Sequence, residues 1–152
     1  MAKKECPRVG DRIVLKINGD LSKNTPLGMV EDFGYGSGWK HNGVVLTGEQ
    51  TQEFMVVEVG YQPNLAAVQR AIEAKYGVKP EDHRGQWMQA YRAEYEANGT
   101  NPVGIADASW VVPDGFAFFP YVDSDGGPFF GWTGDVLRVY WLWLVPASAP
   151  GK

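Results

Sequence analysis

One run of residues decides the fold that this sequence predicts: Asp135-Val136-Leu137-Arg138-Val139-Tyr140-Trp141-Leu142-Trp143-Leu144-Val145. Successive side chains of a β-strand point to opposite faces of the sheet, so both faces of this run would be largely apolar. A strand that is apolar on both faces is normally covered on both faces. The run therefore predicts a central strand of a sheet, with the alternative that one of its faces awaits a partner.

The remaining strand signals predict a mostly antiparallel sheet around this run. Ile13, Leu15 and Ile17 alternate with less apolar neighbours and predict a first strand. Further short strands are expected where apolar residues lie between turn signals, namely at 29–33, 44–46, 53–59, 109–112, 116–122 and 129–133. The second and third of these would pair as a hairpin, and Pro120 marks an edge strand or a bulge.

Two helices are expected in the middle of the chain, at 63–98. The first would start after an N-cap at Asn64 and stop at Gly77, and the second would start at Pro80. Because their linker is short, the two helices are expected to pack as an antiparallel hairpin.

Together these elements predict a single α+β domain over 1–152, with the helical hairpin inserted into an antiparallel sheet that could curl into a partial barrel. Flexible tails are expected at 1–8 and 146–152.

Composition and charge exclude several classes of protein. A chain of 152 residues with 44% hydrophobic and 21% charged residues can bury a real core and is not disordered. Its net charge of −4 disfavours direct binding to nucleic acid. The charge is uneven, since basic residues exceed acidic ones up to Lys23 and acidic residues dominate after residue 101. Such a dipolar chain could steer a charged partner, although solvated faces give the same count.

The single cysteine, Cys6, excludes an internal disulfide, and the residues after Met1 do not resemble a secretory leader. Both features predict a cytoplasmic protein. No apolar run is long enough to span a membrane as a helix, so no membrane partner is expected.

The most distinctive loop runs from Gly34 to Gly43 and carries Tyr35, Trp39, Lys40 and His41. Its glycines would allow backbone N–H groups to converge on an anion, with Lys40 adding positive charge. The spacing differs from that of a phosphate-binding loop. Two further interpretations remain open: the two aromatic rings could stack on a base or sugar, or they could fold back onto the domain.

Arg138 is the one basic residue in the central run. If the strand is buried, the guanidinium must meet an internal carboxylate, a backbone oxygen or an anionic ligand, because an unpaired buried charge is costly. The sequence leaves internal pairing and ligand contact open.

Aromatic residues make up 13% of the chain and gather in its C-terminal part. The cluster comprises Trp110, Phe116, Phe118, Phe119, Tyr121, Phe129, Phe130, Trp132, Tyr140, Trp141 and Trp143. Alternation sends these side chains to both faces of the sheet, while only two helices are available as cover. We therefore expect one face to stay partly exposed, as at binding interfaces.

Three functions follow from these signals. The first is a non-catalytic binding protein whose aromatic surface, including Trp132 and the Gly34–Gly43 loop, contacts a protein partner or a second copy of the chain. A phage or mobile-element accessory protein that blocks a host protein would fit this description. The second is a binder of a nucleotide or another small anion that uses Tyr35, Trp39, Lys40 and Arg138.

The third is a small enzyme with His41 or His83 as general base. Neither histidine has other metal ligands at suitable spacing, so no metal or cofactor is expected.

Overall fold

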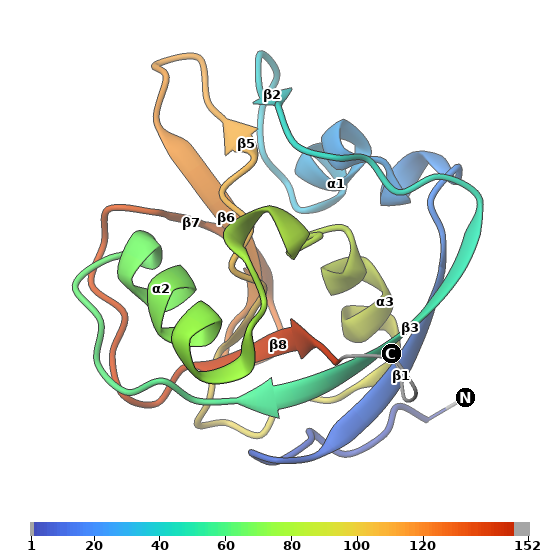
Figure 1. Ribbon diagram of the computed structural model, residues 1–152. Helices are drawn as coiled ribbons and strands as arrows, with labels where there is room; N and C mark the ends of the chain where they lie inside the picture. Colours follow the sequence, from blue (N-terminus) through green and yellow to red (C-terminus); the bar gives the residue numbers. More distant parts are fainter. Residues whose placement is uncertain (1, 148–152) are drawn as a thin grey trace.

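The computed structural model describes residues 2–147 and shows an α+β fold (Figure 1). The strands are β1 (Arg12–Asn18), β2 (Lys40–His41), β3 (Glu49–Val57), β4 (Val103–Gly104), β5 (Trp110–Val111), β6 (Ala117–Val122), β7 (Pro128–Trp132) and β8 (Leu142–Pro146). The helices are α1 (Pro26–Asp32), α2 (Leu65–Tyr76) and α3 (Trp87–Glu94), with short 3-10 turns η1 (Ser22–Asn24) and η2 (Pro80–Asp82).

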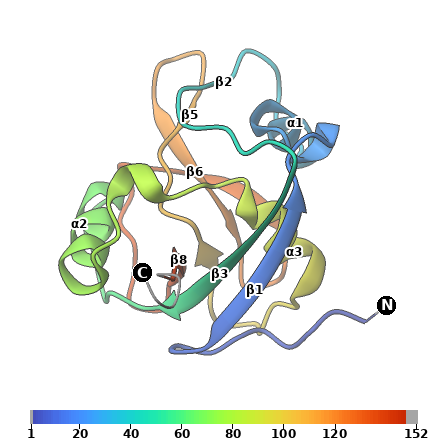
Figure 2. The same ribbon diagram turned by 45° about the vertical axis from the view of Figure 1, so that its right-hand side comes forward.

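The eight strands form one sheet in the order β1-β3-β8-β4-β6-β5-β2, and β7 pairs with β6. Every pair is antiparallel except β4 with β8, which is parallel. The mostly antiparallel α+β architecture predicted from the sequence is confirmed, and the sheet stays open rather than closing into a barrel. The β5–β6 hairpin and β2 stand above the rest of the molecule in Figures 1 and 2.

Strand β8 is central and buried on both faces, as its sequence predicts. It lies between β3 and β4. Leu142 and Leu144 belong to one apolar core, which includes Met88 and Tyr91 of α3 and which we call the α3 core. Trp143 and Val145 belong to a second, the α2 core, which includes Val68 and Ile72 of α2.

The strand is shorter than expected, because regular pairing starts at Leu142. Before it, Leu137 makes only an isolated bridge with Gln62, and the backbone turns between Arg138 and Trp141. The neighbouring strand β3 ends at Val57, opposite Trp143. The residues before Leu142 therefore have no β3 backbone to pair with. Val136, Val139 and Tyr140 are consequently exposed, although they continue the apolar pattern.

Helix α2 has the predicted ends. The Asn64 side chain accepts a hydrogen bond from the Ala67 N–H at 2.9 Å, and Gly77 closes the helix in the left-handed conformation with φ +75°.

The second helix, α3, begins at Trp87 rather than at Pro80, which starts only the turn η2. The two helices contribute to separate cores and cover opposite faces of the sheet, so the predicted helical hairpin is not formed.

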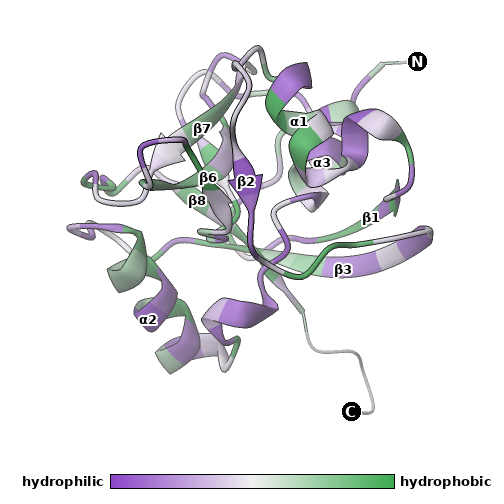
Figure 3. Ribbon diagram, turned by 90° about the horizontal axis from the view of Figure 1, so that it is seen from above, coloured by the Kyte–Doolittle hydropathy of each residue, from purple (hydrophilic) through white to green (hydrophobic). Residues whose placement is uncertain are grey.

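Three other expectations about the first third of the chain are wrong. The segment at 29–33 lies in helix α1, which Thr25 caps and Pro26 starts. The segment at 44–46 is a loop, and β3 pairs with β1 and β8 instead. Figure 3 shows that β3 changes from hydrophilic at one end to hydrophobic at the other, and only its apolar end reaches the core.

The N-terminal segment is not a loose tail throughout. Lys4 pairs with the end of α3: its N–H donates to the Glu94 carbonyl at 2.7 Å, and its carbonyl accepts from the Glu96 N–H at 2.8 Å. In the tail expected at 146–152, Ala147 is tied to β3 by a hydrogen bond to the Glu53 carbonyl, and 148–152 lie outside the described residues. Within 2–147, no helix is both long and apolar enough to cross a membrane.

Candidate functional site

The aromatic side chains of the Gly34–Gly43 loop fold back onto the domain. Trp39 is half-buried, with its ring centroid 5.1 Å from Phe130 and 5.5 Å from Phe118. Tyr35 packs edge-on against Trp39 at 5.2 Å and against Phe130 at 5.6 Å. Both rings extend the α3 core. Of the interpretations left open by the sequence, folding back is the one that the structure shows.

Tyr35 also protects the outer edge of the sheet. Its hydroxyl oxygen accepts a hydrogen bond from the Phe130 N–H at 3.0 Å and lies 3.5 Å from the Phe130 carbonyl oxygen, to which it can donate. Phe130 is in the middle of β7, whose first residue, Pro128, has no N–H to offer. Pairing of another strand with β7 is therefore disfavoured.

Lys40 and His41 form β2, opposite Val111 and Trp110 of β5. Lys40 is exposed, whereas the His41 ring is half-buried and lies 4.6 Å from the Trp110 ring. A hollow of about 310 Å³ beside the loop is lined by Leu27, Val30, Glu31, Tyr35, Gly36, Ser37, Gly38 and Trp39. Its one charged lining residue is an acid, and Lys40 is not part of it, so it does not suit an anion.

Arg138 is exposed in the turn that precedes β8, and it pairs with no carboxylate among residues 2–147. The prediction that it lies buried in a strand is wrong, because the ladder starts only at Leu142. Its neighbour Leu137 packs in the α2 core, on the face opposite to Tyr35 and Trp39. The structure therefore does not assemble the anion site predicted from this arginine and the loop.

Because Arg138 is exposed, we expect the charge-reversing change Arg138→Glu to alter the free energy of unfolding by less than about 0.5 kcal/mol. Urea unfolding followed by tryptophan fluorescence measures this change. A loss of several kcal/mol would show that the guanidinium is buried after all.

The two histidines, distant in sequence, converge on one buried carboxylate, Asp107. One of its oxygens accepts the Gly85 N–H at 2.7 Å, and the other accepts the Ser109 N–H at 3.1 Å and the Ser109 hydroxyl. The negative charge of Asp107 acts on both His41 and His83. The sequence signal for this cluster was an isolated acid inside the apolar run at 102–112, and it was missed.

Both histidines are held in the neutral form by burial. Desolvation lowers the pKa of His83 to about 4, and it also lowers the pKa of His41. In both cases the charge of Asp107 opposes the shift. His83 is only 2% exposed, and neither of its ring nitrogens has a hydrogen-bond partner among the described residues. Asp107 is engaged by the Gly85 N–H, the Ser109 N–H and the Ser109 hydroxyl, and none of the hydrogen bonds among residues 2–147 joins it to either imidazole.

Two of the exposed aromatic residues, Phe116 and Trp132, meet where β6 begins and β7 ends. Phe116 is 55% exposed and Trp132 is 46% exposed, and their rings meet edge to face with centroids 6.1 Å apart. We call this pair the Phe116–Trp132 surface. Of the six site residues that the sequence predicts, Trp132 is the aromatic one that remains accessible.

This surface packs on the core beneath it. Trp132 lies opposite Phe118 in the β6–β7 ladder, and Phe118 packs against Trp39. On its other side the indole lies so close to Gly134 that a Cβ there would come within 2.4 Å of Cζ2 of Trp132. The ring thus lies between Phe116 and a glycine whose missing side chain leaves room for the indole.

Comparison of the chain with protein-family models, with curated proteins and with solved structures finds no match.

Proposed function

We propose that this chain is a non-catalytic binding protein that docks on a protein partner through the Phe116–Trp132 surface. The observation that carries the proposal is a pair of large aromatic side chains, about half exposed, whose rings meet where β6 begins and β7 ends. Exposed aromatic residues of this kind are enriched at the energetic centres of protein interfaces.

The contacts of the Trp132 ring strengthen the proposal, because a side chain that already packs on its neighbours loses less conformational entropy on binding. The Trp132 ring is confined by its contacts with Phe116 and Gly134. An aromatic side chain also buries a large area for only two rotatable bonds.

Charge around the surface indicates the chemistry of the partner. Asp114 lies in the turn that leads to Phe116, and the N–H of Asp135 donates to the Trp132 carbonyl. Both aspartates are exposed, and the structure gives neither an ion pair with a described residue. We therefore propose a partner with an apolar pocket rimmed by basic side chains, which such acids would steer into place.

The alternative of self-association through the sheet has less support. Tyr35 occupies the backbone groups of Phe130 at the β7 edge. The opposite edge strand, β1, carries the exposed side chains of Arg12 and Lys16. Charged side chains on an edge strand disfavour the addition of another strand.

The experiment uses the intact chain as bait in an extract of the cells that produce it, with bound proteins identified by mass spectrometry. A captured protein is then purified and its Kd is measured. We expect Trp132→Ala and Phe116→Ala each to weaken this complex at least about tenfold, because each removes a central aromatic anchor.

Tyr61→Ala is the matched control. Tyr61 is an aromatic residue with a similar exposure, 53%, in a loop outside the Phe116–Trp132 surface. All three variants should keep the melting temperature of the parent within a few degrees. Equal binding by the parent and the Trp132→Ala variant would overturn the proposal, as would a complex that only Tyr61→Ala weakens.

A further inference from the structure

A second surface feature is independent of the aromatic pair. Four basic side chains from four separate segments line one pocket of about 540 Å³: Lys3 before β1, Lys16 in β1, Lys23 in η1 and Arg92 in α3. Among the described residues that line it, Asp32 is the only acid. The whole chain carries a net charge of −4, so this excess of positive charge is local.

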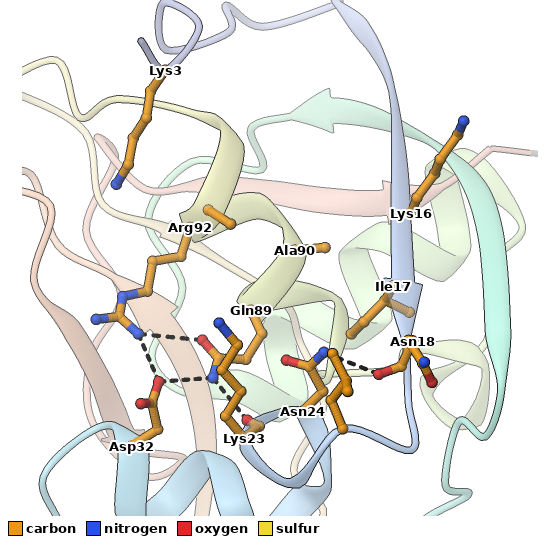
Figure 4. Close-up of a pocket in the computed structure, with 12 residues that line it drawn as sticks. Lys3, Lys16, Ile17, Asn18, Lys23, Asn24, Asp32, Gln89, Ala90 and Arg92 are labelled. Carbon is orange, nitrogen blue, oxygen red and sulfur yellow. Dashed lines mark hydrogen bonds and ion pairs between the residues drawn. The ribbon is translucent and has the colours of Figure 1, made fainter. Parts of the chain in front are cut away.

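Figure 4 shows how the cations are arranged. The Lys3 side chain descends toward Arg92, and the Lys23 side chain rises beside Gln89 on the same side of the pocket, whereas Lys16 stands apart on β1. Among the described residues, none of the three lysines takes part in an ion pair. Their charges are therefore available to a ligand.

The floor of the pocket is fixed by a hydrogen-bond network around Gln89, which is 7% exposed. Its Nε2 donates to the Lys23 carbonyl at 2.8 Å and to Oδ2 of Asp32 at 2.9 Å. Arg92 donates through Nη1 to the same Asp32 oxygen at 2.9 Å and to Oε1 of Gln89 at 3.3 Å. This network orders the backbone that carries Lys23 before any ligand binds.

The network also leaves donors of Arg92 unused. Both of its hydrogen bonds come from Nη1, and within residues 2–147 neither Nη2 nor Nε has an acceptor. Hydrogen bonding from Gln89, followed by the effects of Arg92, keeps the pKa of Asp32 below its usual range. The charge of Lys23 also contributes to this lowering, so the Asp32 carboxylate offsets part of the charge of both Arg92 and Lys23. One carboxylate nevertheless faces four basic side chains in this lining.

Apolar atoms complete the lining, from Ile17, Leu21, Ala90 and Ala93. The volume lies within the range of small-molecule sites, which typically combine apolar walls with a few polar groups. A ligand that suits this pocket has a compact organic body and an anionic end that several ammonium groups can share.

We propose that this pocket binds a small molecule that carries two or more phosphate groups. Lysine ammonium groups act as mobile point charges that adapt to phosphate oxygens, and the free edge of Arg92 adds directed donors. The site differs from the one that the sequence suggested at the Gly34–Gly43 loop and Arg138. It shares no residue with the Phe116–Trp132 surface, so either proposal can fail without the other.

The test is isothermal titration calorimetry of the full chain with ADP and with pyrophosphate, at low salt and at physiological salt. We expect both probes to bind the parent with one-to-one stoichiometry. The double variant Lys3→Gln/Lys23→Gln should bind about tenfold more weakly, because it removes two of the positive charges that face the phosphate groups.

The matched control is Lys40→Gln/Lys79→Gln, which removes the same charge from two exposed lysines outside the pocket. It should bind both probes like the parent. An equal loss in the two double variants would show non-specific attraction and would overturn the proposal, as would the absence of binding by the parent. Binding of citrate or of an oligonucleotide, but of neither phosphate probe, would also overturn it.

A second measurement does not depend on the stability of the variants. Amide chemical shifts of the parent, recorded during titration with ADP, should change at Lys23, Asp32, Gln89 and Arg92. Changes confined to other parts of the chain would place the ligand elsewhere and would refute the assignment of this pocket.

Discussion

Replacing Gln86 with methionine is expected to lower the free energy of unfolding by about 3 kcal/mol, because three buried hydrogen bonds disappear together. Gln86 is 1% exposed and directly precedes α3, and its side chain bonds to other segments rather than to the helix. Its Oε1 accepts the Leu46 N–H at 2.7 Å, while its Nε2 donates to the Asn24 carbonyl at 2.7 Å and to the Leu46 carbonyl at 3.3 Å. Methionine has a similar length but leaves these backbone groups without partners.

Urea unfolding of the parent and the variant measures this effect. Gln50→Met is the matched control, because Gln50 is exposed and makes a single side-chain hydrogen bond, to the Thr47 carbonyl. The control should change the stability by less than about 0.5 kcal/mol. If both substitutions had equally small effects, the Gln86 side chain would not be what joins α3 to η1 and to the loop before β3.

Acidification should destabilise the fold through His83. The pKa of this residue is about 4 in the folded chain, since burial disfavours the charged ring, and about 6.5 when unfolded. Between these two values the unfolded chain binds a proton that the folded chain excludes. The free energy of unfolding therefore falls as the pH drops from 6.5 to 4, by about 3 kcal/mol from this residue, and this contribution stays constant below pH 4.

Unfolding by urea at several pH values between 7 and 4 checks this prediction, with His83→Leu as the comparison. The variant should lose about 3 kcal/mol less than the parent over this range. Part of the pH dependence should remain, since the pKa of His41 is also lowered by burial. Parallel curves for parent and variant would mean that His83 takes up its proton as readily in the folded chain as in the unfolded one.

Local sequence patterns predicted a helix or strand correctly where neighbouring elements are present along its whole length. The double-faced apolar pattern at 142–145 correctly predicted a central strand, and Asn64 and Gly77 correctly bounded helix α2. The same pattern continues through Val136 and Val139, which are exposed, because a strand needs neighbours and β3 ends opposite Trp143. The apolar pattern of one segment contains no information on the length of a neighbouring strand that is distant in sequence.

The segment at 29–33 failed for a local reason. Its apolar residues suggested a strand, but Thr25 and Pro26 supply an N-cap and a first helical residue, and these end signals identify α1. In this segment the capping signals were a better guide than the apolar content.

The sequence could indicate a candidate site only where its residues lie close together in the chain. Trp132 stands in a single aromatic hairpin, and its exposure followed from too little cover for the sheet. The meeting of His41 and His83 at Asp107, and of Lys3 and Arg92 at one pocket, depends on long-range packing. Spacing along the chain contains no signal for such convergence.

The position of β8 has a consequence during biosynthesis. Both of its neighbours, β3 and β4, precede it in the chain, so they are made before the strand that joins them. A ribosome that stalls before Leu142 releases a chain in which the apolar end of β3 has an open edge, and such edges promote aggregation. Premature termination late in this message should therefore yield fragments that aggregate, rather than a folded protein of lower stability.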